Sequence, residues 1–133
     1  MTALNKDRNT AKRAGAVHND PVAASATIFA GSITVLNATG YAAPGTTAIG
    51  LTARGLCQKQ VDNSAGADGD LAVDTQPGIY QLANDGSVTR TDIGGTAYIV
   101  DDQTVANTDG TNTRSAAGII TDVDADGVWV QIG

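Results

Sequence analysis

The chain has 133 residues, of which 41% are hydrophobic, and it carries a net charge of −6. All 14 acidic residues are Asp, a residue that favours turns, and none is the helix-favouring Glu, so a protein rich in surface helix is excluded. The acidic balance and the low aromatic content argue against nucleic-acid binding, and no apolar run reaches the ~18 residues of a membrane span.

The first 15 residues are polar and without periodicity, so we expect an extended, flexible arm (1–15) ahead of a single β-domain (16–133). Residues 1–20 hold four basic side chains, Lys6, Arg8, Lys12 and Arg13, against Asp7 and Asp20. That segment therefore carries +2 and the remaining 113 residues carry −8. A basic arm on an acidic body predicts that the arm docks on a partner through electrostatic attraction; the alternative is a solvated, disordered terminus.

Short apolar runs with turn residues every ~8–12 positions follow the arm. Strands are predicted over residues 26–30, 32–37, 41–43, 48–61, 70–75, 79–83, 88–91, 97–100 and 103–106. Gly50 and Gly55 predict kinks in the longest run, and the one helical turn that we expect lies near residues 91–94. With the hairpin below, about ten short strands indicate an all-β sandwich or barrel. Its core of small Ala, Val and Ile side chains buries little area, which favours an oligomer.

The chain ends in a predicted β-hairpin, in which two alternating runs flank the turn Asp124-Ala125-Asp126-Gly127. Pairing Val123 with Val128 places six side chains on one face: Ile119, Thr121, Val123, Val128, Val130 and Ile132. The other face then holds Ile120, Asp122, Trp129 and Gln131. We expect Trp129 to cover a second apolar layer, with a subunit contact as the alternative.

Asp122, Asp124 and Asp126 match the first half of an EF-hand calcium loop. Position twelve of that loop would be Gly133 instead of Glu, and strands flank the motif instead of helices. We therefore expect these residues to close a turn and assign no metal; a calcium site on the three carboxylates is the alternative.

A catalytic site would have to use His18, the one histidine, or Cys57, the one cysteine. No Gly-x-Ser-x-Gly elbow is present, and nothing in the spacing of His18 and Cys57 indicates a nucleophile pair. We expect Cys57 to be a small core residue, and we expect no enzyme activity and no cofactor.

Five stretches in chain order resemble one protein family. They are Met1–Leu4 with Asp7–Thr10, Gln60–Gly66, Asp92–Gly94 with Ala97–Val105, Arg114–Gly118, and Asp124–Val130. Together they span nearly the whole chain. In these stretches the chain resembles the capsid decoration (cement) proteins of tailed bacteriophages. The resemblance implies a compact domain, β-tulip-like or jelly-roll-like, that forms homotrimers at three-fold and quasi-three-fold positions of the virion.

The resemblance also implies that the protein binds the outer surface of the expanded head and clamps neighbouring major capsid protein subunits together. It then resides in the host cytoplasm during assembly and on the outer surface of the virion afterwards. On charge grounds, we take Lys6, Arg8, Lys12 and Arg13 as candidate capsid contacts. The alternative function is a calcium-dependent β-module that binds a receptor or carbohydrate at a virion surface. Its distinguishing feature is the cluster of Asp122, Asp124 and Asp126 beside Trp129.

Overall fold

The computed structural model describes residues 2–3, 5–9 and 17–133. It confirms the all-β class, because the described residues form twelve strands and a single turn of 3-10 helix. The strands are β1 His18–Pro21, β2 Thr27–Ile28, β3 Ile33–Leu36, β4 Ala42–Pro44, β5 Thr52–Cys57, β6 Val61–Asp62, β7 Ala72–Gln76, β8 Gly78–Asn84, β9 Thr96–Ile99, β10 Thr104–Ala106, β11 Ala116–Asp124 and β12 Gly127–Ile132. The helical turn η1, Arg90–Asp92, overlaps the predicted position (91–94) and begins one residue earlier.

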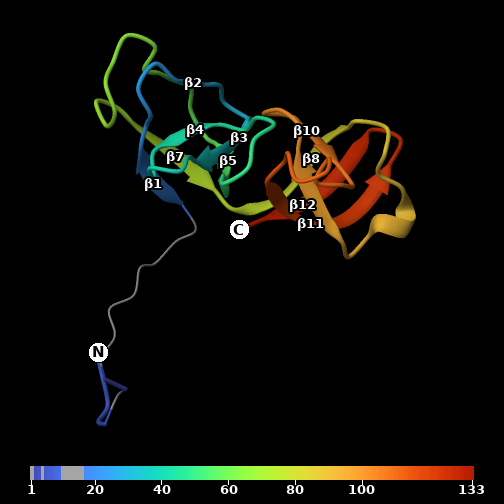
Figure 1. The fold of residues 1–133 in the computed structure, drawn as a ribbon, viewed down its shortest axis with the longest axis horizontal. Helices are drawn as coiled ribbons and strands as arrows, with labels where there is room; N and C mark the ends of the chain where they lie inside the picture. Colours follow the sequence, from blue (N-terminus) through green and yellow to red (C-terminus); the bar gives the residue numbers. More distant parts are fainter. Residues whose placement is uncertain (1, 4, 10–16) are drawn as a thin grey trace.

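The N-terminal half is a curled five-stranded antiparallel sheet in the order β1-β7-β5-β3-β4 (Figure 1). Its two ends meet at one bridge after β1, where the Ala23 N–H donates to the Ala42 carbonyl at 2.8 Å. The small pair β2–β6 packs Ile28 into the core of this sheet. That core is small and consists of Val22, Ile28, Ala42, Cys57 and Val73.

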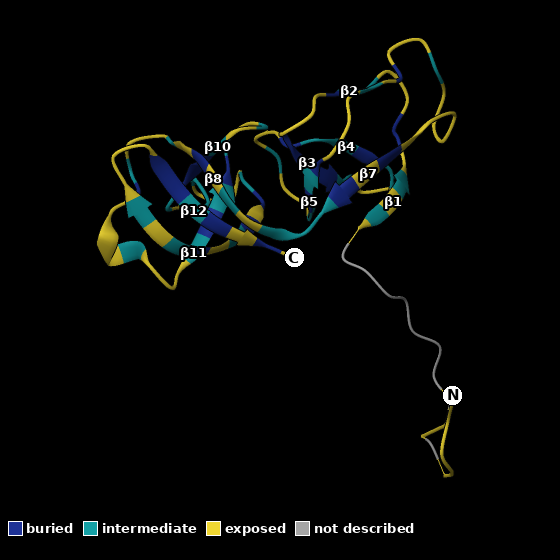
Figure 2. Cartoon of the chain, turned by 180° about the vertical axis from the view of Figure 1, so that it is seen from behind, coloured by how far each residue is buried: buried dark blue, intermediate teal, exposed yellow. Residues whose placement is uncertain are grey.

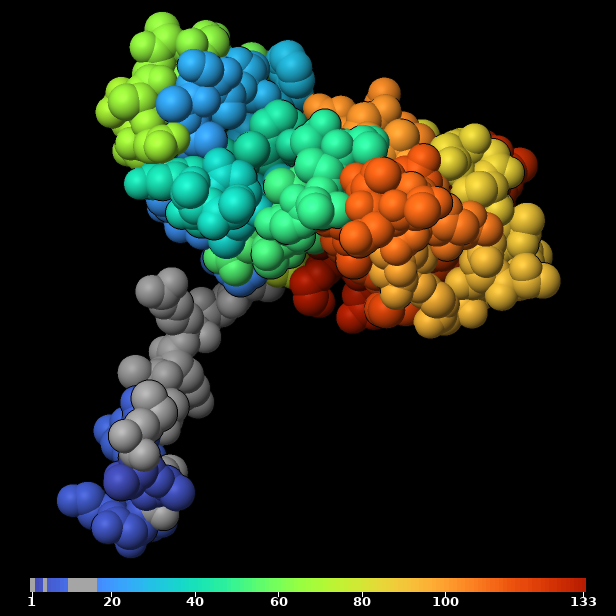
Figure 3. Space-filling model, in the orientation of Figure 1, coloured from blue at the N-terminus to red at the C-terminus, as the bar shows by residue number. Residues whose placement is uncertain are grey.

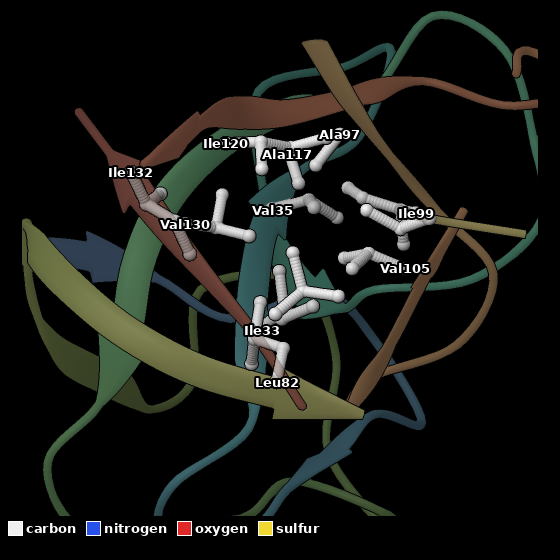
Figure 4. Packing of buried hydrophobic residues seen from close by; sticks show 12 residues of the cluster. Ile33, Val35, Leu82, Ala97, Ile99, Val105, Ala117, Ile120, Val130 and Ile132 are labelled. Atoms are coloured by element: carbon white, nitrogen blue, oxygen red, sulfur yellow. The ribbon is translucent and has the colours of Figure 1, made fainter. Parts of the chain in front are cut away.

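The C-terminal half is a closed five-stranded barrel in the order β10-β8-β12-β11-β9. Every neighbouring pair is antiparallel except β10–β8. Figure 4 shows that side chains from all five strands converge on one core, which Ile33 and Val35 of β3 also enter. Because β3 belongs to the other sheet, one core joins the two halves, and Figure 3 shows them in continuous contact.

The chain passes from one half to the other at Pro77, between β7 and β8. Gly55 of β5 lies against this crossing, and a Cβ at that position would lie 2.6 Å from the backbone carbonyl of Gln76. Its φ of +148° also disfavours any other residue. Since Thr34 faces Gly55 and Val35 faces Ala53, Arg54 is an extra, bulged residue in β5. The kink predicted at Gly55 is therefore confirmed as a β-bulge.

Two elements are shorter or different from those predicted. The run expected to be one strand over residues 48–61 contains β5, a turn and the start of β6. Residues 88–91, predicted as a short strand, instead lead into η1, where Asp92 Oδ2 accepts the Thr89 N–H at 2.8 Å. Local capping by Asp92 therefore overrides the weak strand preference of this segment.

The C-terminal hairpin forms with Val123 opposite Val128, as predicted, but its register then shifts. Ile120 faces Val130 and Asp122 faces Trp129, so Thr121 is a bulged residue without a partner. The predicted pairing of Thr121 with Val130 and of Ile119 with Ile132 is therefore wrong.

The bulge at Thr121 exchanges the faces of two neighbouring isoleucines. Ile120 is 1% exposed in the core and Ile119 is 46% exposed on the outside, the reverse of the prediction. Figure 2 shows the resulting alternation of buried and exposed residues along β11 and β12. One extra residue inverts every assignment beyond it because side chains alternate with a period of two.

Candidate functional site

The Asp-rich turn between β11 and β12 uses its carboxylates within the hairpin. Asp124 Oδ1 accepts the backbone N–H groups of Asp126 at 2.8 Å and Gly127 at 3.1 Å. Its Oδ2 accepts the indole Nε1–H of Trp129 at 2.9 Å. These donors, the indole first, lower the pKa of Asp124 because they stabilise its charged form.

Asp122 points to different partners from those of Asp124. Its Oδ1 accepts the Val123 N–H at 2.8 Å and pairs with the Arg90 guanidinium at 3.1 Å. Within residues 2–3, 5–9 and 17–133, no group of three acidic, His or Cys side chains is placed to hold a metal ion. The two carboxylates therefore act in turn closure and in positioning Trp129 and Arg90.

His18 and Cys57 lie in one row of the N-terminal sheet, with Thr75 of β7 between them. Two strand spacings separate their backbones by about 9.6 Å. Cys57 is 2% exposed and its thiol donates to the Lys59 carbonyl at 3.1 Å. Burial raises the pKa of this thiol. His18 and Cys57 are therefore too far apart for a hydrogen bond between a base and a nucleophile. Cys57 is a core residue, as predicted.

The basic arm is described in part. Lys6 and Arg8 are exposed, whereas Lys12 and Arg13 lie outside the described residues. The body from residue 17 onward holds only four cations, Arg54, Lys59, Arg90 and Arg114. Arg54 pairs with Asp20 through two hydrogen bonds of 2.8 and 3.1 Å, and Arg90 pairs with Asp122. The body therefore keeps most of its carboxylates without an opposite charge among the described residues.

An uncharged row crosses four strands on the outer face of the barrel. Thr96 of β9 faces Ile119 of β11, Ile119 faces Gln131 of β12, and Gln131 faces Ile79 of β8. Ile79 is 55% exposed and Ile119 is 46% exposed. We call these four residues the outer barrel row. A charge-free centre of this kind is typical of the core of a protein interface.

Trp129 lies beside the outer barrel row, half-buried and opposite Asp122 and Gln81. It is not part of either hydrophobic core, so the expectation that it covers a second apolar layer is wrong. Sequence reasoning missed the outer barrel row because the bulge at Thr121, which turns Ile119 outward, has no sequence signal.

Comparisons with protein-family models, with curated proteins and with solved structures find no match. Among the residues that the structure describes, no helix is long and apolar enough to cross a membrane.

Proposed function

We propose that this chain is a decoration protein of a tailed bacteriophage, which binds the outer surface of the expanded head and bridges major capsid protein subunits. The observation that carries the proposal is the separation of charge: the arm (1–15), with Lys6 and Arg8 exposed, carries +3 and precedes an all-β body (16–133) that carries −9. The sequence resemblance supplies the identity of the partner. In this function the chain acts without catalysis and without a cofactor.

The stabilising effect follows from mass action. A protein that binds the expanded shell and not the unexpanded one favours the expanded state by its difference in affinity for the two. Many copies on one head add their contacts, so each contact needs only modest strength. A closed barrel suits this role because it presents a surface of fixed shape and has no free strand edges.

Self-association belongs to the proposal, with homotrimers at three-fold and quasi-three-fold positions. The outer barrel row supports it, since Ile79 and Ile119 leave apolar area on a face without charge. The protein would then reside on the outer surface of the virion, after a stage in the host cytoplasm during assembly.

The test is co-sedimentation of the purified protein with matched phage heads, expanded and unexpanded, in the presence of EDTA. We expect saturable binding to expanded heads alone. A variant without residues 1–15 should keep its folded body and lose most of this binding, because the basic segment is gone. Absence of binding to either head form would refute the decoration function, and binding that needs calcium would favour the calcium-dependent module.

A further inference from the structure

A depression lies where the two halves of the molecule meet. It has a volume of about 350 Å³ and is formed by the loop between β2 and β3 and the loop between β9 and β10. Its lining residues are Phe29, Ala30, Gly31, Ser32, Asp102 and Gln103. We call it the Phe29 depression.

Backbone hydrogen bonds fix both walls of the Phe29 depression. The Ile33 N–H donates to the Asp102 carbonyl at 2.8 Å and the Gly31 N–H donates to the Cys57 carbonyl at 2.9 Å. On the far wall, the Gln103 carbonyl accepts the Ala83 N–H at 2.8 Å. The shape therefore exists before any ligand arrives, which lowers the entropic cost of binding.

The chemistry of the lining favours a cation. Phe29 is the one phenylalanine of the chain, and it is 55% exposed at the rim. The Asp102 carboxylate forms no ion pair with a described residue, and Asp101 adds a second negative charge next to it. An aromatic face beside an unpaired carboxylate binds a Lys or Arg side chain through cation–π and charge-assisted contacts.

We propose that the Phe29 depression binds the basic segment 5–9 of a second copy of this chain. That segment reads Asn-Lys-Asp-Arg-Asn and is exposed. Lys6 and Arg8 are two residues apart, so an extended chain presents both on the same side. One cation can then reach the Phe29 ring while the other reaches Asp102.

The occupant comes from a neighbouring copy because the arm of the same copy is too short. Figures 1 and 2 show that β1, which follows the arm, begins on the lower edge of the body, whereas the loops between β2 and β3 and between β9 and β10 run along its upper edge. From Val17 to Lys6 an extended chain spans about 37 Å. A compact domain with the length of residues 17–133 has a radius of gyration of about 13 Å, which corresponds to a sphere of radius about 17 Å, so a path around half of that sphere is about 53 Å.

A contact between the arm of one copy and the depression of the next is heterologous. Such contacts close into rings when the rotation between copies allows it, and a ring of three is one such closure. The inference rests on the self-association that we propose above and supplies one of its contacts. It assigns Lys6 and Arg8 to a neighbouring copy and leaves Lys12 and Arg13 as candidate capsid contacts.

The test is disulfide trapping between two full-length variants in the absence of heads. One variant carries Asn5→Cys in the arm, and the other carries Gln103→Cys at the depression. A mixed disulfide joins two different chains, so its rate of formation reports contact between copies. The control partner carries Ala125→Cys, which lies between Asp124 and Asp126 in the turn from β11 to β12, outside the two loops that form the depression.

We expect the Asn5→Cys chain to couple with the Gln103→Cys chain about tenfold faster than with the Ala125→Cys chain. Phe29→Ala or Asp102→Asn in the Gln103→Cys chain should remove most of that preference, since Phe29 is exposed and its loss leaves the core intact. Equal rates for the two partners, or a preference that survives both substitutions, would overturn the inference. Head binding is measured separately, so a failure here leaves the decoration function standing.

Discussion

The C-terminal barrel and the N-terminal sheet each contain five strands, yet the barrel closes through paired strands all round and the sheet closes through one bridge. The hydrophobic core of the barrel is also larger than that of the N-terminal sheet. The barrel core gathers twelve buried apolar residues, two of which, Ile33 and Val35, come from β3, whereas the N-terminal core has five. Two hydroxyl groups, those of Thr34 and Thr75, are also buried in the N-terminal sheet without a hydrogen-bond partner among the described residues.

This difference indicates that the two halves of the chain contribute differently to stability and to the candidate contacts. The barrel core contains more buried apolar side chains, so truncating one of them should lower the free energy of unfolding strongly. The N-terminal sheet follows the arm at β1 and supplies one wall of the Phe29 depression, and the barrel supplies the other wall and the outer barrel row. The predictions below test this comparison, from the largest expected effect to the smallest.

Truncating the barrel core should have the largest effect. We expect Ile120→Ala to reduce the free energy of unfolding by about 3–4 kcal/mol, because it removes a side chain that is 1% exposed. The matched variant Ile119→Ala, one residue earlier and outside the barrel, should cost less than about 0.5 kcal/mol. Denaturant unfolding measures both, and equal losses would contradict the bulge at Thr121.

Breaking the clamp across the N-terminal sheet should have an intermediate effect. The bulged Arg54 reaches over β7 to Asp20 of β1, and their side chains are 28% and 13% exposed. Arg54→Ala should cost about 1–2 kcal/mol of the free energy of unfolding, because it leaves the Asp20 carboxylate partly buried and unpaired. Adding Asp20→Asn should recover part of that loss, and no recovery would show that Arg54 acts through packing alone.

Replacing a buried, unpaired hydroxyl should raise stability. We expect Thr75→Val to increase the free energy of unfolding by about 1 kcal/mol, since a methyl group avoids the desolvation cost of the hydroxyl. Thr104→Val, at a half-buried position in the barrel strand β10, is the matched control and should change little. A loss of stability in Thr75→Val would show that this hydroxyl has a partner in solution.

The smallest effect concerns pH and Asp124. Its pKa lies below the usual value of 3.8, so the charged form is favoured by folding and its contribution is present at neutral pH. That contribution is lost as the pH falls through the lowered folded pKa. The wild type should therefore melt at a higher temperature than Asp124→Asn at pH 7, and the gap should narrow below pH ~4. A gap that stays constant down to pH 2 would contradict the role of the Asp124 charge.

Much of the fold is encoded in local patterns that a sequence reveals. Alternation and turn residues predict the all-β class, and Asp126-Gly127 predicts where the last hairpin turns. The parallel pairing of β10 with β8 and the closure of the barrel depend on contacts distant in sequence, so no local pattern indicates them.

The candidate surfaces were less predictable than the strands. The bulges at Arg54 and Thr121 each insert one residue, and together they place Arg54 toward Asp20 and Ile119 on the outer barrel row. Trp129 was expected to cover a second apolar layer, yet a hydrogen bond to Asp124 holds it on the outer face. The Phe29 depression arises where two loops meet, which only the three-dimensional structure reveals.

The most direct test of the proposed function is the temperature at which expanded heads release their DNA, measured with and without the purified protein. We expect that temperature to rise with protein concentration until the binding sites are full, because the protein stabilises the shell that it binds. The variant without residues 1–15 should raise it far less at the same concentration. An unchanged release temperature on heads that carry bound protein would contradict a stabilising role.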